Sequence, residues 1–474
     1  MKPVARIIKN TGVEVVSNVF NMLLSAVFTF FIARAFGPGL YGTFSIVTTF
    51  PLFFTSFMLF GLDCILIRDI ARDRNVAGKI LCNAILFQLL LAAITFLLIS
   101  VTIAILGYDT NMKELINLFF FFCIITSITT VNTTSFRAFE RMEFNSILNT
   151  GEKILVLLLG IAAIMNSYRV RGIIIVFIIA GLIKLAASIL ITFRKFTKWD
   201  MTVDTSIWKY FLKEGYPVAV SSFFTSFRWN IVILVISRTL TESDAGFYNA
   251  AFKLTYPILL ITFAYSTAIL PMMSVFHDSS REKLVRIYKI SCKLAMAITI
   301  PVSIFITFYA DDIVRIILGD KYTSSVDVLR IVIWILPFSF LVYPLGNVLV
   351  SVNHQKDAMV ANGVNAALLF VCEIVLTEKY GLLGACAGIV AAEALLAVMY
   401  FYCVTLRFRY ISIAEFLLKP SVSGLGMSAV IIMSSGAGKI ISGIAGLVVY
   451  VAVAYFSKVF SSNEVQKVRE ALSI

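Results

Sequence analysis

The sequence is poor in charged residues and in histidine. Only 14% of its 474 residues are charged and only two are histidines, whereas a typical soluble domain is about 25% charged. Hydrophobic residues make up 59% of the chain, and the mean hydropathy is +0.93. A single water-soluble core cannot hold this apolar excess, so the composition excludes an ordinary soluble protein and predicts an integral membrane protein.

The sequence also lacks the motifs of common catalytic and metal sites. Its seven cysteines form no C-x-x-C pair, and we interpret them as small core residues. There is no His/Cys cluster for a metal, no glycine-rich phosphate loop and no catalytic triad candidate. No predicted loop has room for a soluble catalytic domain. We therefore expect a protein that is not an enzyme and has neither metal nor cofactor.

The net charge of +13 does not indicate nucleic-acid binding. The basic residues are spread in short clusters between apolar stretches, which is the pattern of membrane topology signals. We therefore expect membrane lipid, and no nucleic acid, as a partner.

Long apolar runs are the dominant feature of the chain. A membrane-spanning helix needs about 20 mostly apolar residues, and the fold class we predict is all-α with about fourteen such helices. The expected segments are 12–34, 43–64, 80–107, 114–134, 147–166, 171–193, 211–238, 248–275, 284–309, 328–351, 358–377, 382–406, 415–435 and 439–457.

The distribution of lysine and arginine predicts the orientation. With the N-terminus in the cytoplasm and alternating spans, the inside segments hold 27 basic residues and the outside segments 10. Cytoplasmic loops are enriched in basic residues, so we expect both termini in the cytoplasm. The apolar run 13–33 is too long for a signal peptide and is predicted to be a retained first helix.

Two segments of the chain resemble each other. Arg34 precedes Gly42 by eight residues, and Arg238 precedes Gly246 by the same distance, at an offset of 204. We predict a parallel repeat of two six-helix bundles with a substrate site between the halves. The expected domains are 1–200, 201–410 and a final part, 411–474, with two further helices and a cytoplasmic tail.

Several polar side chains fall inside the predicted spans. Glu14, Asn18 and Asn21 lie on one face of the first helix. Such residues are costly in lipid and tend to face the bundle interior or a wet cavity. We predict that they line a cavity; ordinary interhelical hydrogen bonding is the alternative.

Cationic side chains inside the spans are the central observation. Arg228 lies near the middle of its apolar run, where it cannot easily reach either surface. Since contacts to phosphate strengthen as water is excluded, a cationic cavity suits a pyrophosphate or an acidic sugar. The alternative is internal pairing with Glu14, Glu152, Glu373 or Glu393. The other residues assigned to this cavity are Thr225, Asn249, Lys253 and Lys184.

Four further charged residues are candidates for gating or ion coupling. Asp63 and Arg68 follow the second predicted helix, where they suggest a salt-bridge network or a gate. Glu373 and Glu393 lie in later helices. They could carry protons, bind sodium or neutralise the cations.

The segment Ala33-Arg34-Ala35-Phe36-Gly37-Pro38-Gly39-Leu40-Tyr41-Gly42 closely resembles the helix 1–2 junction of Wzx-type polysaccharide flippases. These belong to the multidrug/oligosaccharidyl-lipid/polysaccharide exporter superfamily. Three other parts of the chain also resemble this family: Gly61-Leu62-Asp63 with Arg68-Asp69-Ile70-Ala71, Arg137-Ala138-Phe139-Glu140-Arg141, and Glu214-Gly215-Tyr216-Pro217 with Ala245-Gly246-Phe247-Tyr248-Asn249-Ala250-Ala251.

The resemblance implies a MATE-like fold with a cationic central cavity and alternating access. It also implies a lipid-linked oligosaccharide or polysaccharide repeat unit as cargo in the cytoplasmic membrane, and glycan polymerases or glycosyltransferases as possible partners. The chain departs from the family at Asn230, near which many members carry an aspartate. A cation-coupled multidrug exporter and a peptidoglycan-precursor (lipid II) flippase are the alternative functions.

Overall fold

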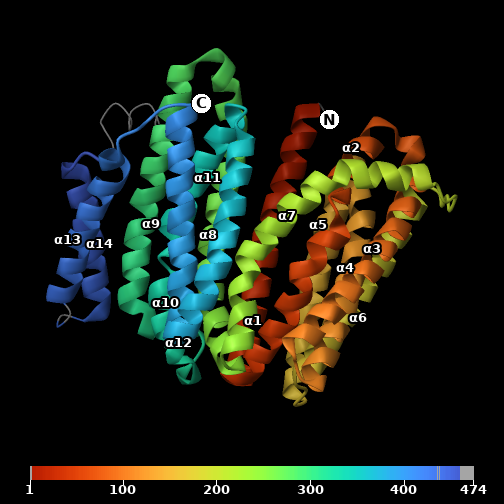
Figure 1. Ribbon diagram of the computed structural model, residues 1–474, viewed down its shortest axis with the longest axis horizontal. Coiled ribbons are helices and arrows are strands. Elements are labelled where there is room, and N and C mark those ends of the chain that lie inside the picture. Colours follow the sequence, from red (N-terminus) through yellow and green to blue (C-terminus); the bar gives the residue numbers. More distant parts are fainter. Residues whose placement is uncertain (1–2, 435, 437, 460–474) are drawn as a thin grey trace. The chain divides into compact units, whose positions relative to one another are not determined.

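The computed structural model describes residues 3–434, 436 and 438–459, and within them the chain is helical without strands (Figure 1). The predicted cytoplasmic tail after residue 459, together with Lys2, Lys467 and Arg469 of the charge count, lies outside the described residues. By its internal contacts the chain divides into two compact units, residues 1–249 and 250–474.

The first unit contains seven long or medium helices and the start of an eighth. They are α1 (Pro3–Leu59), α2 (Leu62–Arg72), α3 (Ala77–Leu106), α4 (Thr110–Ala138), α5 (Met142–Met165), α6 (Val170–Ile191), α7 (Thr205–Thr239) and α8 (Glu242–Ser279), with a 3-10 turn η1 (Arg74–Val76) and a π-turn η2 (Thr192–Phe196).

The second unit takes the remainder of α8 and the helices after it. These are α9 (Arg281–Ile317), α10 (Ser324–Val332), α11 (Ile335–Ser351), α12 (Gln355–Arg407), α13 (Lys419–Met433) and α14 (Lys439–Phe456), with short turns η3 (Asp320–Tyr322) and η4 (Ala414–Leu418). In Figure 1, α13 and α14 form a hairpin, and both contact α9.

Two helices are each bent at a glycine. Gly37 in α1 has φ 70° and ψ 174°, and Gly381 in α12 has φ 61° and ψ −143°. A positive φ is easily adopted only by glycine. Each bend falls between two predicted spans, so α1 and α12 each cover two of the expected segments.

Eleven of the described helices are long and apolar enough to cross a membrane. Two of them, α1 and α12, are the bent helices, and the predicted span 248–275 falls within α8. The prediction of an all-helical, multi-pass membrane protein is thus confirmed, whereas the count of fourteen spans stays a prediction.

The division at residues 249 and 250 lies inside α8. The sequence prediction placed its boundary at residue 200, because it followed the internal repeat rather than spatial contacts. That the repeat defines the two functional halves stays a prediction.

The two glycines that the repeat pairs with each other are in contact. A Cβ atom on Gly42 would lie 1.7 Å from the carbonyl oxygen of Glu242, and one on Gly246 would lie 2.0 Å from that of Pro38. Ser45 and Asn249, also 204 residues apart, are joined by a hydrogen bond of 2.6 Å. The part of α1 just after its bend and the start of α8 therefore cross at a distance that only glycine allows.

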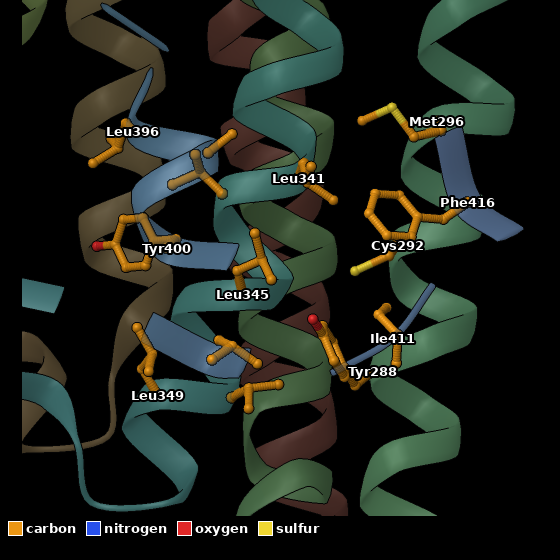
Figure 2. Close-up of a cluster of buried hydrophobic side chains, with 14 of the residues drawn as sticks. Tyr288, Cys292, Met296, Leu341, Leu345, Leu349, Leu396, Tyr400, Ile411 and Phe416 are labelled. Atoms are coloured by element: carbon orange, nitrogen blue, oxygen red, sulfur yellow. The ribbon is translucent and has the colours of Figure 1, made fainter. Parts of the chain in front are cut away.

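Each unit has its own apolar core. In the first unit, Phe211 of α7 is fully buried against α2 and α3, so the start of α7 covers one end of these helices. In the second unit, side chains of α9, α11 and α12 meet in a shared cluster, seen in Figure 2. Its labelled members include Tyr288, Leu345 and Tyr400.

Candidate transport sites in the two units

The polar face predicted for the first helix is present in α1. Glu14 Oε1 accepts a hydrogen bond from Arg137 Nη2 of α4 at 2.8 Å, and Asn21 Nδ2 donates to Ser17 Oγ at 3.3 Å. Asn18 is exposed. Because Glu14 is 25% exposed and Arg137 42%, the ion pair is partly accessible and therefore weak. From the sequence, Arg137 was named in one of the family-like segments and was not assigned to the cavity.

Lys184 of α6 forms a buried ion pair with Glu152 of α5. The Nζ–Oε2 distance is 2.7 Å, and the side chains are only 12% and 7% exposed. Two opposite charges in a low-dielectric interior stabilise each other when their geometry is good. The positive charge of Lys184 is thus compensated within the unit. This contact agrees with the alternative in which the cations pair internally, since Glu152 was one of the candidate partners.

The middle of α7 carries the arginine singled out from the sequence. The Arg228 guanidinium lies over the ring of Trp229, 5.0 Å from its centroid, and is half-buried. Thr225 is exposed, and its hydroxyl donates to the carbonyl of Ser221 at 3.1 Å. Asn230, near the family's aspartate position, donates to the carbonyl of Ser226 at 2.8 Å. An amide there supports the helix but brings no negative charge.

The two candidates on α8 fall in different units. Asn249 belongs to the first unit, where its Nδ2 donates to Ser45 Oγ of α1. Lys253 belongs to the second, and its Nζ lies 5.4 Å from the ring centroid of Tyr256. That Lys253 shares one cavity with Arg228 stays a prediction.

Arg68 is the centre of a polar network that joins α2 to α7. Its guanidinium contacts Asp69 at 3.0 Å and Glu214 at 3.2 Å, and Tyr210 donates to Asp69 at 2.8 Å. Asp63 lies in the first turn of α2 and is half-buried. The sequence predicted a network around Arg68 but not its partners on α7, although Glu214 occurs in one of the family-like segments.

Two carboxylates are buried in the second unit. Glu393 is 1% exposed and accepts a hydrogen bond from Ser339 Oγ at 3.0 Å. Glu373 is completely buried, and neither of its carboxylate oxygens has a hydrogen-bond partner among the described residues. Across the bend of α12, a Cβ on Gly388 would lie 2.6 Å from Glu373 Oε1. Glycine thus makes room for this carboxylate, which suits a proton or a small cation.

An apolar cavity of about 630 Å³ lies within the second unit, between α9, α11, α12 and α13. Its lining is aliphatic and aromatic, with hydroxyl groups from Thr307, Ser421 and Ser428 as its polar members. Gly424 of α13 packs directly on Ile304 of α9 and keeps the two helices close. No sequence pattern located this cavity, because it depends on how separate helices pack.

Among the described residues, no group of three histidine, cysteine, aspartate or glutamate side chains could hold a metal ion. All seven cysteines are free thiols.

Comparison with known proteins identifies the family. The model of the family "Polysaccharide biosynthesis protein" matches residues 7–277, more than half of the chain, and the MatE model matches residues 217–375. A "Probable low-salt glycan biosynthesis flippase Agl15" from Haloferax volcanii is 22% identical over 183 residues, which cover 38% of this chain and 39% of that protein. The chain therefore matches well under half the length of this curated relative.

Solved structures share the fold. The "Lipid II flippase MurJ, inward closed conformation" has a TM-score of 0.75 at 16% identity, covering 95% of this chain and 99% of the other. An inward-facing multidrug resistance MATE family transporter has a TM-score of 0.65 at 15% identity, covering 82% and 94%. These confirm the MATE-like fold, and the relatives are flippases and transporters rather than enzymes. The chain belongs to the polysaccharide biosynthesis protein family, within the multidrug/oligosaccharidyl-lipid/polysaccharide exporter superfamily.

Proposed function

We propose that this protein is a flippase that moves lipid-linked oligosaccharide or polysaccharide repeat units across the cytoplasmic membrane by alternating access. Both termini lie in the cytoplasm, as the distribution of basic residues indicates. The family match and the glycan flippase among its relatives support this reading.

The apolar cavity of the second unit is the observation that carries the proposal. A lipid-linked glycan has a long hydrocarbon tail, which needs a continuous apolar surface while its headgroup crosses the membrane. Residues of η4 and α13 form one wall of the cavity, including Phe416 of η4 and Leu425 of α13. A multidrug exporter with twelve helices would lack this wall, because α13 and α14 are the two helices beyond the predicted bundles.

The phosphate and glycan are bound by the cationic and polar side chains predicted to line the central cavity. Arg228 supplies a guanidinium that lies over an aromatic ring. A guanidinium can bind two phosphate oxygens in a bidentate geometry. Lys253 supplies a second cation. The polar face of α1 with Glu14 and the compensated Lys184 contribute hydrogen bonds rather than net charge.

Glu373 is the group we assign to ion coupling. An uncompensated buried carboxylate is costly, so its stable states are the protonated acid and a complex with a cation. Exchange between these states would change the charge between the two halves of α12. Glu393, which is hydrogen-bonded to Ser339, is the second candidate. Arg68, with its contacts to α7, and Asp63 in the same short helix are assigned to a gate.

Two other cargoes are the alternatives. The shared fold with the solved lipid II flippase favours a peptidoglycan precursor, and the MatE match over residues 217–375 favours a drug. A peptidoglycan precursor would use the same lipid and phosphate contacts. A cation-coupled drug exporter would instead confer drug resistance in its host.

The proposal is tested in a deletion strain of the source organism. Lipid-linked glycan should accumulate on the cytoplasmic face while surface glycan disappears. The wild-type gene and the control Arg238→Ala, which changes another arginine of α7, should restore surface glycan, whereas Arg228→Ala should not, at equal protein levels. Unchanged surface glycan in the deletion strain, with new drug sensitivity, would overturn the glycan role.

A further inference from the structure

Four phenylalanine side chains form a cluster at one end of the first unit. Phe136 and Phe139 come from the end of α4, Phe144 from the start of α5 and Phe196 from η2. The Phe196 ring centroid lies 5.6 Å from that of Phe136, 5.1 Å from Phe139 and 5.8 Å from Phe144. Two chain segments that are distant in sequence, the α4–α5 junction and η2, thus meet around one aromatic group.

Three cations lie over two of these rings. The Arg74 guanidinium is 5.5 Å from the centroid of Phe139. The Lys195 ammonium and the Arg141 guanidinium are 4.8 Å and 5.6 Å from the centroid of Phe144. Ring faces attract cations, but two like charges on one ring repel each other. Glu143 relieves part of that repulsion through its ion pair with Arg141, and a further anion beside Lys195 would relieve more of it.

The neighbouring acidic residues do not balance these cations. Over residues 72–79, 137–143 and 194–200 there are eight basic and four acidic side chains. Glu143 pairs with Arg141 at 2.7 Å, and two more of these cations pair with carboxylates outside the three ranges, Arg137 with Glu14 and Lys79 with Asp204. With Glu14 and Asp204 included, eight basic side chains face six acidic ones. The end of the unit retains a net positive charge that suits an anionic ligand.

The backbone that carries the cluster is unusual in two places. Glu140, between Phe139 and Arg141, has φ 58°, which is uncommon for a residue with a side chain. Residues Thr192–Phe196 form a π-helical turn, an element found frequently at functional sites. Both features position cations, because Glu140 directly precedes Arg141 and the turn Thr192–Phe196 contains Lys195.

The surroundings indicate the depth of the site in the membrane. The rings of Phe193 in η2 and of Trp199 just after it stack with their centroids 3.6 Å apart, and tryptophan is typical of the membrane–water interface. Ile147, one turn after Phe144, is 65% exposed, and Leu190 near the end of α6 is 53% exposed. An apolar surface for acyl chains therefore adjoins cations at the level of lipid phosphates.

We propose that Arg74, Arg141 and Lys195, held over Phe139 and Phe144, bind the phosphate headgroup of an anionic phospholipid of the bilayer. The acyl chains of this lipid lie along the exposed apolar residues of α5 and α6. This lipid site is independent of the cargo and stands whether or not the protein transports a glycan.

The test measures lipid binding to the purified full-length protein by native mass spectrometry, with phosphatidylglycerol and phosphatidylcholine of identical chains. The site variant replaces the three cations with glutamine, and the control variant replaces three basic residues of the predicted outside loops in the same unit: Arg74→Gln, Arg141→Gln and Lys195→Gln against Lys113→Gln, Arg169→Gln and Arg171→Gln.

Each basic residue near an anionic lipid contributes about a fivefold increase in affinity. We expect wild-type protein to prefer phosphatidylglycerol by at least about tenfold and the site variant to lose on the order of a hundredfold in affinity for it. The control variant should stay within about twofold of wild type. Equal losses in both variants, or no loss in the site variant, would overturn the proposal.

Phe144→Leu keeps every charge and removes the ring that Arg141 and Lys195 share. It should lower the preference for phosphatidylglycerol several-fold, and it serves if the triple variant does not fold. A polyprenyl phosphate supplied as a third lipid shows whether the site binds the phosphate of a phospholipid or that of a carrier lipid. If the site variant loses only the polyprenyl phosphate, the site belongs to the carrier lipid and the phospholipid assignment is wrong.

Discussion

The buried ion pair between Lys184 and Glu152 allows a quantitative test of how the first unit handles charge. The atoms are 2.7 Å apart, and the side chains are 12% and 7% exposed. Removing one partner of a buried pair leaves an uncompensated charge and costs about 3–5 kcal/mol. Because Lys184 keeps some access to water, we expect Lys184→Met and Glu152→Gln each to lower the free energy of unfolding by about 3 kcal/mol.

The double variant removes both charges and should be far more stable than the sum of the single changes predicts. A double-mutant cycle on denaturant unfolding in detergent micelles measures this coupling, which we expect to exceed about 2 kcal/mol. The exposed pair Arg315 and Asp311, 3.1 Å apart on α9, is the control and should show a coupling below about 1 kcal/mol. Additive single effects at Lys184 and Glu152 would refute the reasoning.

Three further changes test separate features. Gly246→Ala should lower the free energy of unfolding by about 1–3 kcal/mol, because its Cβ would lie 2.0 Å from the carbonyl oxygen of Pro38; an unchanged unfolding curve would contradict the close crossing. The Lys79 ammonium and the groups of Ser206 lower the pKa of Asp204 to about 2. The stability from this contact should be fully present above the carboxyl's ordinary pKa near 4 and should be lost as pH falls toward 2. In Asp204→Asn, the melting temperature should therefore depend less on pH over that range than in wild type. Glu373→Gln should remove the dependence of transport on its coupling cation while leaving the melting temperature near that of wild type; wild-type coupling in this variant would remove Glu373 from the mechanism.

Composition and hydropathy were sufficient to predict the class of fold. The apolar runs needed to span a bilayer are long and are separated by turns, so the helices follow directly from the sequence. The sequence repeat predicted that two segments are equivalent, because the spacing of Arg34 and Gly42 recurs in Arg238 and Gly246. The two glycines, Gly42 and Gly246, are in contact. A close crossing of this kind restricts the sequence locally, which is why a weak repeat remained visible.

The partners of charged residues were harder to predict. Glu152 was one of several candidate partners for the cations, and only packing brings it to Lys184. Glu214 and Tyr210 are about 140 residues from Arg68 along the chain, so no local pattern links them. The apolar cavity and the cation–aromatic cluster have the same origin, because each is assembled from several helices that are distant in sequence.

The most direct test of the proposed function is flipping by purified protein in liposomes. Fluorescent lipid-linked oligosaccharide in the outer leaflet becomes inaccessible to a membrane-impermeant quencher when it moves to the inner leaflet. We predict that wild-type protein and Arg238→Ala will protect the glycan lipid from the quencher and that Arg228→Ala will not. Equal protection by liposomes without protein, or full protection by Arg228→Ala, would contradict the proposal that this protein carries a lipid-linked glycan through a cationic site.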